Sequence, residues 1–339
     1  MNYSPPLVFL HLLADLKFQP RAVFFSCAVP ASDAANGVAS VCSSEDISAY
    51  ATFAADFPCY IAARESAHPL KCLPPELWQG LQDAGGLILA EAALYRCDAL
   101  LKPEPPASAQ WILGEWYLAP PPKAVGSQAV SRTTALRLLQ LVTSDAETRQ
   151  IEDVFRQDPL LSYHLLRLVN SLGVATGKRV TSFAQAILIL GRQQLRRWLN
   201  LMLFAARKDD YRAAMLLARV SVRARSMELL AKATGLDRTM QEQAFMGGMF
   251  SMLGLLFGTP LADILKPLPL SEVLVDAVLR HAGPLGGLLQ MVEAAERGDE
   301  PGVQNGLTQV FLPVAEFNRI NLEAHHWMLG VILDRHENV

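Results

Sequence analysis

From about residue 124 onward, apolar side chains recur every three to four positions, which is the spacing of one face of an α-helix. In "SDAETRQIEDVFRQDP", Ile151, Val154 and Phe155 share such a face. Asp158 and Pro159 favour the start of the next helix, because aspartate caps free amides and proline has no amide hydrogen to leave unbonded. We therefore predict an all-helical region, whose last helices span 210–233, 239–257, 271–282, 284–297 and 313–334.

Residues 1–123 follow a different pattern. Short runs of β-branched and aromatic residues alternate there with stretches rich in Pro, Ser and Asp. We predict strands in these runs and a helix in "LPPELWQGLQDAG", which together give a partial βα arrangement. A closed eight-stranded βα barrel takes ~250 residues, so this region is too short to form one. The predicted strands are 22–29, 59–63, 86–91 and 111–119.

Composition changes where the pattern changes. Residues 1–123 hold all five cysteines and 14 of the 21 prolines, with 7 Lys/Arg against 12 Asp/Glu. Residues 124–339 hold 23 Lys/Arg against 21 Asp/Glu. We predict two domains, an α/β region at 1–123 and a helical domain at 124–339, with the boundary in "APPPKAVGSQAVS". The fold class is accordingly mostly α.

Several classes of protein are disfavoured. The net charge of -3 argues against a dedicated nucleic-acid binder. An odd number of cysteines without Cys-x-x-Cys spacing argues against a zinc site or a disulfide framework. The uncharged run Ala244–Ala262 has the length of a membrane span, but its glycines, Pro260 and the flanking acids favour a buried helix. The N-terminus lacks a secretory pattern, and we predict a cytoplasmic protein with reduced thiols.

The helical region resembles the HDOD family, the HD-related output domain of bacterial signalling proteins, from about Val130 to Gly302. The matching stretches include "IEDVFRQDPLLSYHLLRLVNS", "SFAQAILILGRQQLRRWLNLMLFA" and "RARSMELLAKATG". The resemblance implies a helical bundle related to the HD phosphohydrolases. It is closest to the subgroup in which the HDOD domain follows a degenerate EAL phosphodiesterase domain.

Two stretches of the N-terminal region are similar to EAL domains. "LGEWYLAP" (113–120) resembles the last strand of that fold, with Leu113 in place of a glutamine. "LAEAAL" (89–94) resembles the "Ala-Glu-Gly-Val-Glu" strand, with Glu91 retained and Leu94 at the second acidic position. The resemblance implies that residues 1–123 are a truncated, degenerate part of an EAL barrel.

The residues at the motif positions argue against metal chemistry. HD enzymes carry "Gly-x-x-His-Asp-x-Gly" on a core helix, whereas this chain has "GMFSMLG" at Gly248–Gly254, with Ser251 and Met252 in place of the two ligands. A neutral hydroxyl and a thioether bind a hard divalent ion poorly. The EAL-like region is too short for the full set of carboxylates that two cations require. We predict no metal, no cofactor and no catalytic residue, so that the chain is not an enzyme.

Arginines are the candidate contacts for an anionic ligand or partner, because a guanidinium group binds phosphate or carboxylate through two parallel hydrogen bonds. Pairing with acids of the same chain, such as Asp209 and Asp210, is the alternative. The candidates are Arg192, Arg196, Arg197, Arg219 and Arg223.

The predicted function is non-catalytic regulation in bacterial signal transduction, through protein–protein interactions between the HDOD domain and other signalling proteins. One alternative is a sensor that binds cyclic di-GMP or another nucleotide without hydrolysing it. The other is a metal-dependent phosphohydrolase. The sequence leaves the oligomeric state open.

Overall fold

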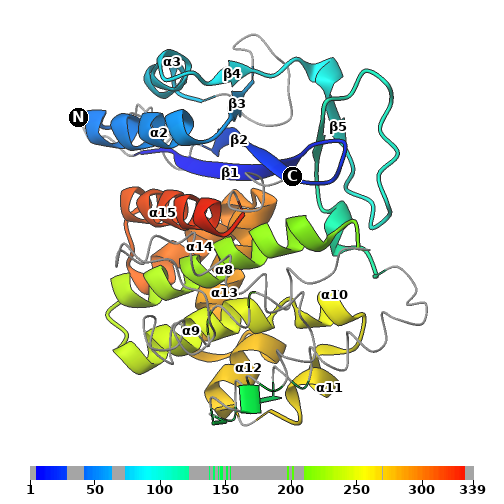
Figure 1. Ribbon diagram of the computed structural model, residues 1–339. Helices are drawn as coiled ribbons and strands as arrows, with labels where there is room; N and C mark the ends of the chain where they lie inside the picture. Colours follow the sequence, from blue (N-terminus) through cyan, green and yellow to red (C-terminus); the bar gives the residue numbers. More distant parts are fainter. Residues whose placement is uncertain are drawn as a thin grey trace.

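The computed structural model describes residues 5–28, 42–62, 73–121, 210–268 and 270–332, together with scattered positions between 137 and 201. An α/β layer, formed by the described residues up to 121, packs on a helical bundle formed by those from 210 onward (Figure 1). Most of the described elements are helices, and all the described strands precede residue 114. The mostly helical fold class is therefore confirmed.

The α/β layer is built on one six-stranded sheet with the order β4-β3-β2-β1-β6-β5. Strand β1 runs antiparallel to β2 and β6, whereas the other neighbouring pairs are parallel. The strands are β1 (Leu7–Ala14), β2 (Pro20–Ala28), β3 (Cys59–Ile61), β4 (Leu87–Ile88), β5 (Leu94–Arg96) and β6 (Trp111–Leu113).

The sheet buries both of its faces over β1 and β2. Val8, Leu10 and Leu12 lie on the face that packs against α2 (Ser44–Asp56) and α3 (Pro75–Asp83). Residues of the opposite face form a separate apolar cluster, which includes Leu13, Phe24 and Leu113. On that face the rings of Tyr60 in β3 and Trp111 in β6 approach to 5.1 Å between centroids, although β2 and β1 lie between those strands. The sheet therefore curls into a half-barrel, and this second face is its concave face.

The helical bundle is organised around α8 (Ala213–Ala233), which is buried on nearly all sides. Figure 1 shows α9, α13 and α15 around it, with α15 next to the sheet. The other helices of the bundle are α9 (Arg238–Phe250), α10 (Leu253–Phe257), α11 (Leu261–Leu265), α12 (Glu272–Arg280), α13 (Gly283–Arg297), α14 (Glu300–Val310) and α15 (Val314–Ile332).

Helix α15 covers the open edge of β1. Strand β6 pairs with β1 only at Ala14, so the first half of β1 has no neighbouring strand on that side among the described residues. Asn318 accepts a hydrogen bond from the Val8 amide (3.0 Å) and donates one to the Pro6 carbonyl (2.8 Å). Asn321, one turn further on, donates to the Val8 carbonyl (3.3 Å). Side chains of a helix thus bond the backbone groups that a further strand would otherwise satisfy.

Most of the predicted elements are confirmed where the structure describes them. The four predicted strands overlap β2, β3, β4 and β6, and the predicted helix in "LPPELWQGLQDAG" is α3. The prediction of a single helix over 239–257 is wrong, because a turn at Ser251 and Met252 separates α9 from α10. The predicted boundary near residue 123, and most of the pattern between 124 and 209, lie outside the described residues.

Among the described helices, none has both the length and the apolar character needed to cross a bilayer. The run Ala244–Ala262 is divided among α9, α10 and α11, so it is not the single buried helix that was predicted.

Candidate functional site

The helix that resembles the HD motif is held tightly against α8. A Cβ atom on Gly248 would lie 2.7 Å from the Ala224 Cα and 2.9 Å from the Ala224 nitrogen. Real Cβ atoms essentially never come so close to backbone atoms, so a glycine is required for this approach of α9 to α8. Ser251 follows at the C-terminal end of α9, and its hydroxyl donates to the Gly248 carbonyl (2.7 Å).

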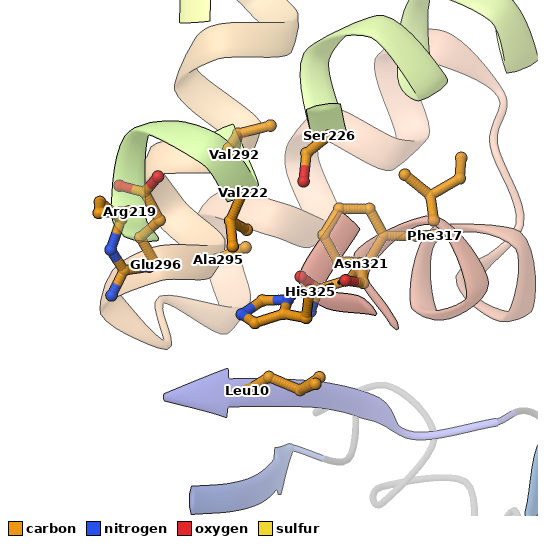
Figure 2. Close-up of a pocket in the computed structure, with 11 residues that line it drawn as sticks. Leu10, Arg219, Val222, Ser226, Val292, Ala295, Glu296, Phe317, Asn321 and His325 are labelled. Carbon is orange, nitrogen blue, oxygen red and sulfur yellow. Dashed lines mark hydrogen bonds between the residues drawn. The ribbon is translucent and has the colours of Figure 1, made fainter. Parts of the chain in front are cut away.

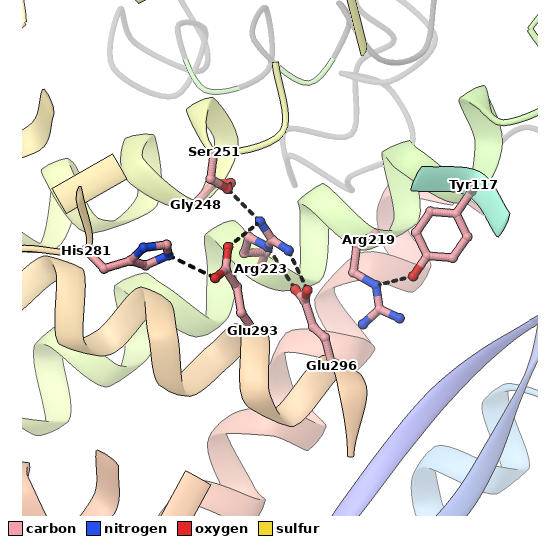
Figure 3. Close-up of polar contacts among 8 residues, drawn as sticks. All are labelled: Tyr117, Arg219, Arg223, Gly248, Ser251, His281, Glu293 and Glu296. Carbon is pink, nitrogen blue, oxygen red and sulfur yellow. Dashed lines mark hydrogen bonds and ion pairs between the residues drawn. The ribbon is translucent and has the colours of Figure 1, made fainter. Parts of the chain in front are cut away.

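The Arg223 guanidinium lies beside Ser251, in the core of the bundle (Figure 3). Its Nη1 donates to the Ser251 Oγ (2.8 Å) and to Glu293 of α13 (3.1 Å). Its Nε and Nη2 donate to the two oxygens of Glu296 (2.9 and 2.5 Å), a bidentate ion pair. His281, at the end of α12, bonds the other oxygen of Glu293 (2.9 Å). We call Arg223, Ser251, His281, Glu293 and Glu296 the arginine cluster.

The arginine cluster is stabilised by its own charges. Burial on its own would raise the pKa of Glu296, but Arg223 and Arg219 outweigh it and hold that pKa below its ordinary value. Burial likewise opposes the charge of Arg223, and the carboxylates of Glu296 and Glu293 raise the pKa of Arg223 above its ordinary value. Both groups are therefore ionised at neutral pH.

The donors around Ser251 do not fit the metal that an HD-type fold implies. Such a metal needs carboxylate and imidazole ligands at the motif positions. Here Ser251 accepts a hydrogen bond from a guanidinium group, and Met252 is fully buried in the apolar core. Among the described residues, no group of three or more His, Cys, Asp or Glu side chains is arranged to hold a metal ion.

A small cavity lies one turn of α8 away, between the helical bundle and the sheet (Figure 2). Arg219, Glu296 and His325 line it together with Leu10 of β1, and it has room for about one water molecule. The Arg219 Nε donates to the Tyr117 hydroxyl (2.9 Å) and so links α8 to the 3₁₀ helix η2 (Trp116–Leu118) of the α/β layer.

His325 is the buried titratable group of this cavity. Its Nδ1 lies 2.8 Å from the Asn321 carbonyl, so that this nitrogen donates in the neutral ring. Its Nε2 is buried on the side of the Leu10 backbone. Burial, with a smaller effect of Arg219, lowers the pKa of His325 to about 4.

The concave face of the half-barrel carries a second set of polar and aromatic residues. His11 of β1 and Ser26 of β2 are buried and bonded to each other (2.8 Å). Burial, helped by Arg219 and Arg96, lowers the pKa of His11 to about 3. Gly298, which ends α13, packs against the His11 ring, since a Cβ there would lie 3.3 Å from the His11 Cε1. The helical bundle therefore contacts this face directly.

Sequence reasoning did not single out this face. His11 is the one polar residue in the strand "LVFLHLLA", and a polar residue within a run of buried apolar ones was the available signal. Tyr60 and Trp111 were recognised only as parts of predicted strands. The Trp111 Nε1 is buried without a hydrogen-bond partner among the described residues, which leaves a donor on the concave side of the sheet.

The predicted arginines have different surroundings. Arg192 and Arg196 lie outside the described residues. Arg197 pairs with Glu228 (2.6 Å) and Glu242 (2.8 Å). Arg219 and Arg223 lie one turn apart on α8, bonded to Tyr117 and to the carboxylates of α13 respectively. Pairing within the chain therefore involves glutamates, whereas Asp210 pairs with the buried Arg212 (2.7 Å).

Comparison with known proteins gives a family match for part of the helical region. Residues 131–263 match the HDOD domain. The Vibrio cholerae protein named cyclic di-GMP phosphodiesterase CdgJ is 29% identical over 214 residues, which cover 62% of this chain and 49% of CdgJ. Uncharacterized protein YuxH of Bacillus subtilis is 27% identical over 161 residues, 47% of this chain and 39% of YuxH. The chain thus spans about half the length, or less, of these relatives.

Two crystal structures are similar to this chain at lower sequence identity. One, described as a "Putative phosphohydrolase" from Shewanella amazonensis, has a TM-score of 0.44 and 18% identity over 59% of this chain and 93% of its own. The other, an HDOD domain protein of unknown function from Geobacter sulfurreducens, has a TM-score of 0.34 and 19% identity over 52% of this chain and 72% of its own.

The similarity to CdgJ contradicts the prediction that this chain is not an enzyme. That prediction rested on Ser251 and Met252 and on the shortness of the N-terminal region, whereas the relative is named as a phosphodiesterase. Ser251 and Met252 replace the metal ligands at one position in the helical bundle. This replacement does not exclude catalytic activity elsewhere in the molecule. What the comparisons identify is an HDOD domain, carried by this chain at residues 131–263.

Proposed function

We propose that this chain acts in cyclic di-GMP signalling, with the nucleotide taken up on the concave face of the α/β layer and the response carried by the HDOD domain. The observation that carries this proposal is the similarity to CdgJ, which extends over 214 residues and therefore well beyond the HDOD match.

The chemistry of the concave face supports uptake of a nucleotide. Tyr60 and Trp111 are partly exposed aromatic residues, and guanine bases stack on such rings. Arg96 stands at the carboxyl end of β5, with 39% of its side chain exposed and a loose ion pair to Asp98 (3.9 Å). Ligands of α/β sheets bind beyond the carboxyl ends of parallel strands, and a guanidinium there suits a phosphate.

We also propose that the α/β layer is a shortened EAL-like region. The stretch "LGEWYLAP" forms β6 and η2, and Glu91 begins an exposed 3₁₀ turn directly after β4. Glu91 therefore follows the carboxyl end of β4. The HDOD domain would pass the signal to other signalling proteins through its surface.

Hydrolysis of cyclic di-GMP is the second candidate, and the name of CdgJ favours it. Among the described residues of the bundle and of the α/β layer, no group of three or more His, Cys, Asp or Glu side chains is arranged to hold a metal ion, so this candidate rests on the similarity to CdgJ. Both candidate functions require cyclic di-GMP to bind. Only hydrolysis releases a linear dinucleotide, so the product distinguishes them.

The test is a calorimetric titration of the full chain with cyclic di-GMP, with and without Mg²⁺ or Mn²⁺, followed by chromatography for the linear dinucleotide. We expect saturable binding that Arg96→Ala weakens at least ~10-fold, since a charge-assisted hydrogen bond contributes about 1.5–3 kcal/mol. Arg280→Ala is the matched control, because Arg280 is exposed and pairs only with Asp276 among the described residues. Appearance of the linear product would establish the second candidate.

Three results would contradict the proposal. Absence of binding under all conditions would remove cyclic di-GMP as the ligand. An equal effect of Arg96→Ala and Arg280→Ala would remove the concave face as the site. A loss of binding in Arg192→Ala or Arg196→Ala, with Arg96→Ala unaffected, would move the site to the predicted arginines of the helical domain.

A further inference from the structure

The helical bundle covers part of the concave face of the half-barrel. Phe9 of β1 and Ala28 of β2 are buried in one apolar cluster with side chains of α13 and α14. On the same face the His11 ring contacts Gly298, where α13 ends with a left-handed backbone (φ 67°). We call the segment that joins the two helices, Arg297–Glu300, the α13–α14 corner. This corner is the bundle's contact with the middle of β1.

The strand register places this contact beyond the carboxyl ends of β5 and β6. In the antiparallel pair of β1 and β6, Ile112 lies opposite Ala14. Strand β6 ends one residue later, at Leu113, and Arg96 ends β5 at the same level. Because β1 runs the other way, His11 lies two strand residues, or ~7 Å, beyond that level.

The corner and the proposed ligand position overlap. Ligands of parallel sheets bind beyond the carboxyl ends of the strands, and Arg96, the proposed phosphate contact, is at that end of β5. Arg96 is one of the charges that lower the pKa of His11, so it lies near the ring on which Gly298 packs. Two acids, Asp299 and Glu300, directly follow Gly298 in the chain, and carboxylates repel phosphate. A nucleotide phosphate on Arg96 therefore competes with the corner for this space.

We propose that the α13–α14 corner is an autoinhibitory plug of the nucleotide site: it occupies the space beyond the carboxyl ends of β5 and β6, and the ligand must displace it in order to bind. This inference rests on the proposed function and adds the direction of the coupling. The chain without ligand is the closed state, and the ligand shifts it to an open one. Displacement moves the end of α13, which packs on α8 at the centre of the bundle (Figure 1).

The test compares two glycine-to-alanine variants of the full chain. Gly298 and Gly235 both follow the end of a helix with a left-handed backbone (φ 67° and 78°), so alanine strains both positions similarly. A Cβ on Gly298 would lie 3.3 Å from the His11 Cε1, whereas a Cβ on Gly235 would meet nothing within 4 Å. Only Gly298→Ala therefore displaces the corner from the concave face, and Gly235→Ala is its matched control.

Cyclic di-GMP is the probe, and its affinity is measured by calorimetry. We expect Gly298→Ala to bind roughly 3- to 10-fold more tightly than the wild type, because the added methyl group destabilises only the closed state. Gly235→Ala should bind like the wild type. In the wild type we expect faster hydrogen exchange at residues 297–302 with the ligand than without it, since displacement exposes the amides of the corner.

Three results would overturn this inference, and only the last also removes the proposed function. If the wild type binds and Gly298→Ala binds no more tightly than Gly235→Ala, the corner does not compete with the ligand. Slower exchange of the corner with the ligand would mean that it closes over the nucleotide as a clamp. Absence of binding in all three proteins would remove cyclic di-GMP as the ligand. Binding by Gly298→Ala alone would support the plug.

Discussion

At the residue scale, the contact of α9 with α8 depends on Gly248. Replacing Gly248 with alanine puts a Cβ against the Ala224 backbone, so the two helices must separate. We expect Gly248→Ala to lower the free energy of unfolding by about 1–3 kcal/mol, measured by urea titration. Gly287→Ala in α13 is the control, because its Cβ would meet nothing within 4 Å and alanine favours a helix by up to ~1 kcal/mol. Equal effects of the two variants would contradict this role of Gly248.

The two buried histidines predict a dependence of stability on pH. His325 and His11 have folded pKa values of about 4 and about 3, both below the ordinary value of 6.5. As the pH falls below 6.5 the unfolded chain takes up protons that the folded chain does not, so the contribution of these histidines to stability is constant above about pH 7. That contribution falls as the pH drops from 6.5 to about 4 for His325 and to about 3 for His11.

The size of this pH effect is testable by urea titration at pH 7.5, 6.0 and 5.0. Each buried histidine contributes a slope of about 1.4 kcal/mol per pH unit between pH 6 and pH 5. We expect His325→Gln to lose about half of the combined slope, because the Asn321 carbonyl, Leu10, Arg219 and Glu296 then surround a group that does not titrate. An unchanged slope in that variant would show that His325 is not the source.

The sequence predicted only part of the site at this scale. The substitution of Ser251 and Met252 at the motif was visible because the flanking glycines keep their spacing. The partners of Arg223 could not be predicted from the sequence. Glu293 and Glu296 lie about 70 residues away, and helical periodicity does not show which faces of two helices meet. His11 was missed because its partner Ser26 belongs to a strand whose register only the folded sheet defines.

At the scale of elements, α15 takes the place of a strand at the edge of β1. Asn318→Ala removes both hydrogen bonds of this side chain and leaves the Val8 amide and the Pro6 carbonyl buried without a partner. We expect a loss of about 2–4 kcal/mol in the free energy of unfolding, with faster hydrogen exchange at the Val8 amide.

Asn305→Ala on α14 is the matched control for this edge. Asn305 is exposed, and its replacement should change the stability by no more than about 0.5 kcal/mol. If Asn318→Ala and Asn305→Ala behave alike, the hydrogen bonds from α15 do not stabilise the sheet edge.

Elements with a regular pattern were predictable, and those without one were not. Helix α12 begins at Glu272 after the Ser271 cap, within one residue of the predicted start. Strand β1 was missed because all eight of its residues are buried, and a strand buried on both faces shows no alternation. The turn between α9 and α10 was missed because its residues, Ser251 and Met252, are neither Pro nor Gly and so give no helix-breaking signal in the sequence.

At the scale of the whole molecule, the α/β layer and the helical bundle share one buried interface. Three features cross it: the edge bonds from Asn318 and Asn321, the Arg219 bond to Tyr117, and the contact of Gly298 with His11. The buried Arg212 adds a fourth, since it donates to the carbonyls of Ala119 and Leu255. A sequence with a change of composition near residue 123 predicts two regions, but it does not show that they pack against each other so extensively.

This interface gives the proposed function a physical route. A ligand on the concave face lies on the strands that carry His11 and Arg96, and the end of α13 touches the same face at Gly298. A ligand that binds one arrangement of this contact better than another will shift the helical bundle toward it. Binding of the nucleotide should therefore change the structure or the dynamics on both sides of the interface.

Hydrogen exchange of the full chain with and without cyclic di-GMP tests this requirement most directly. We predict slower exchange in β3, β5 and β6, where the ligand binds, together with a change at the end of α13 and the start of α14. Unchanged exchange throughout the chain, or a change confined to the helical bundle, would contradict the account.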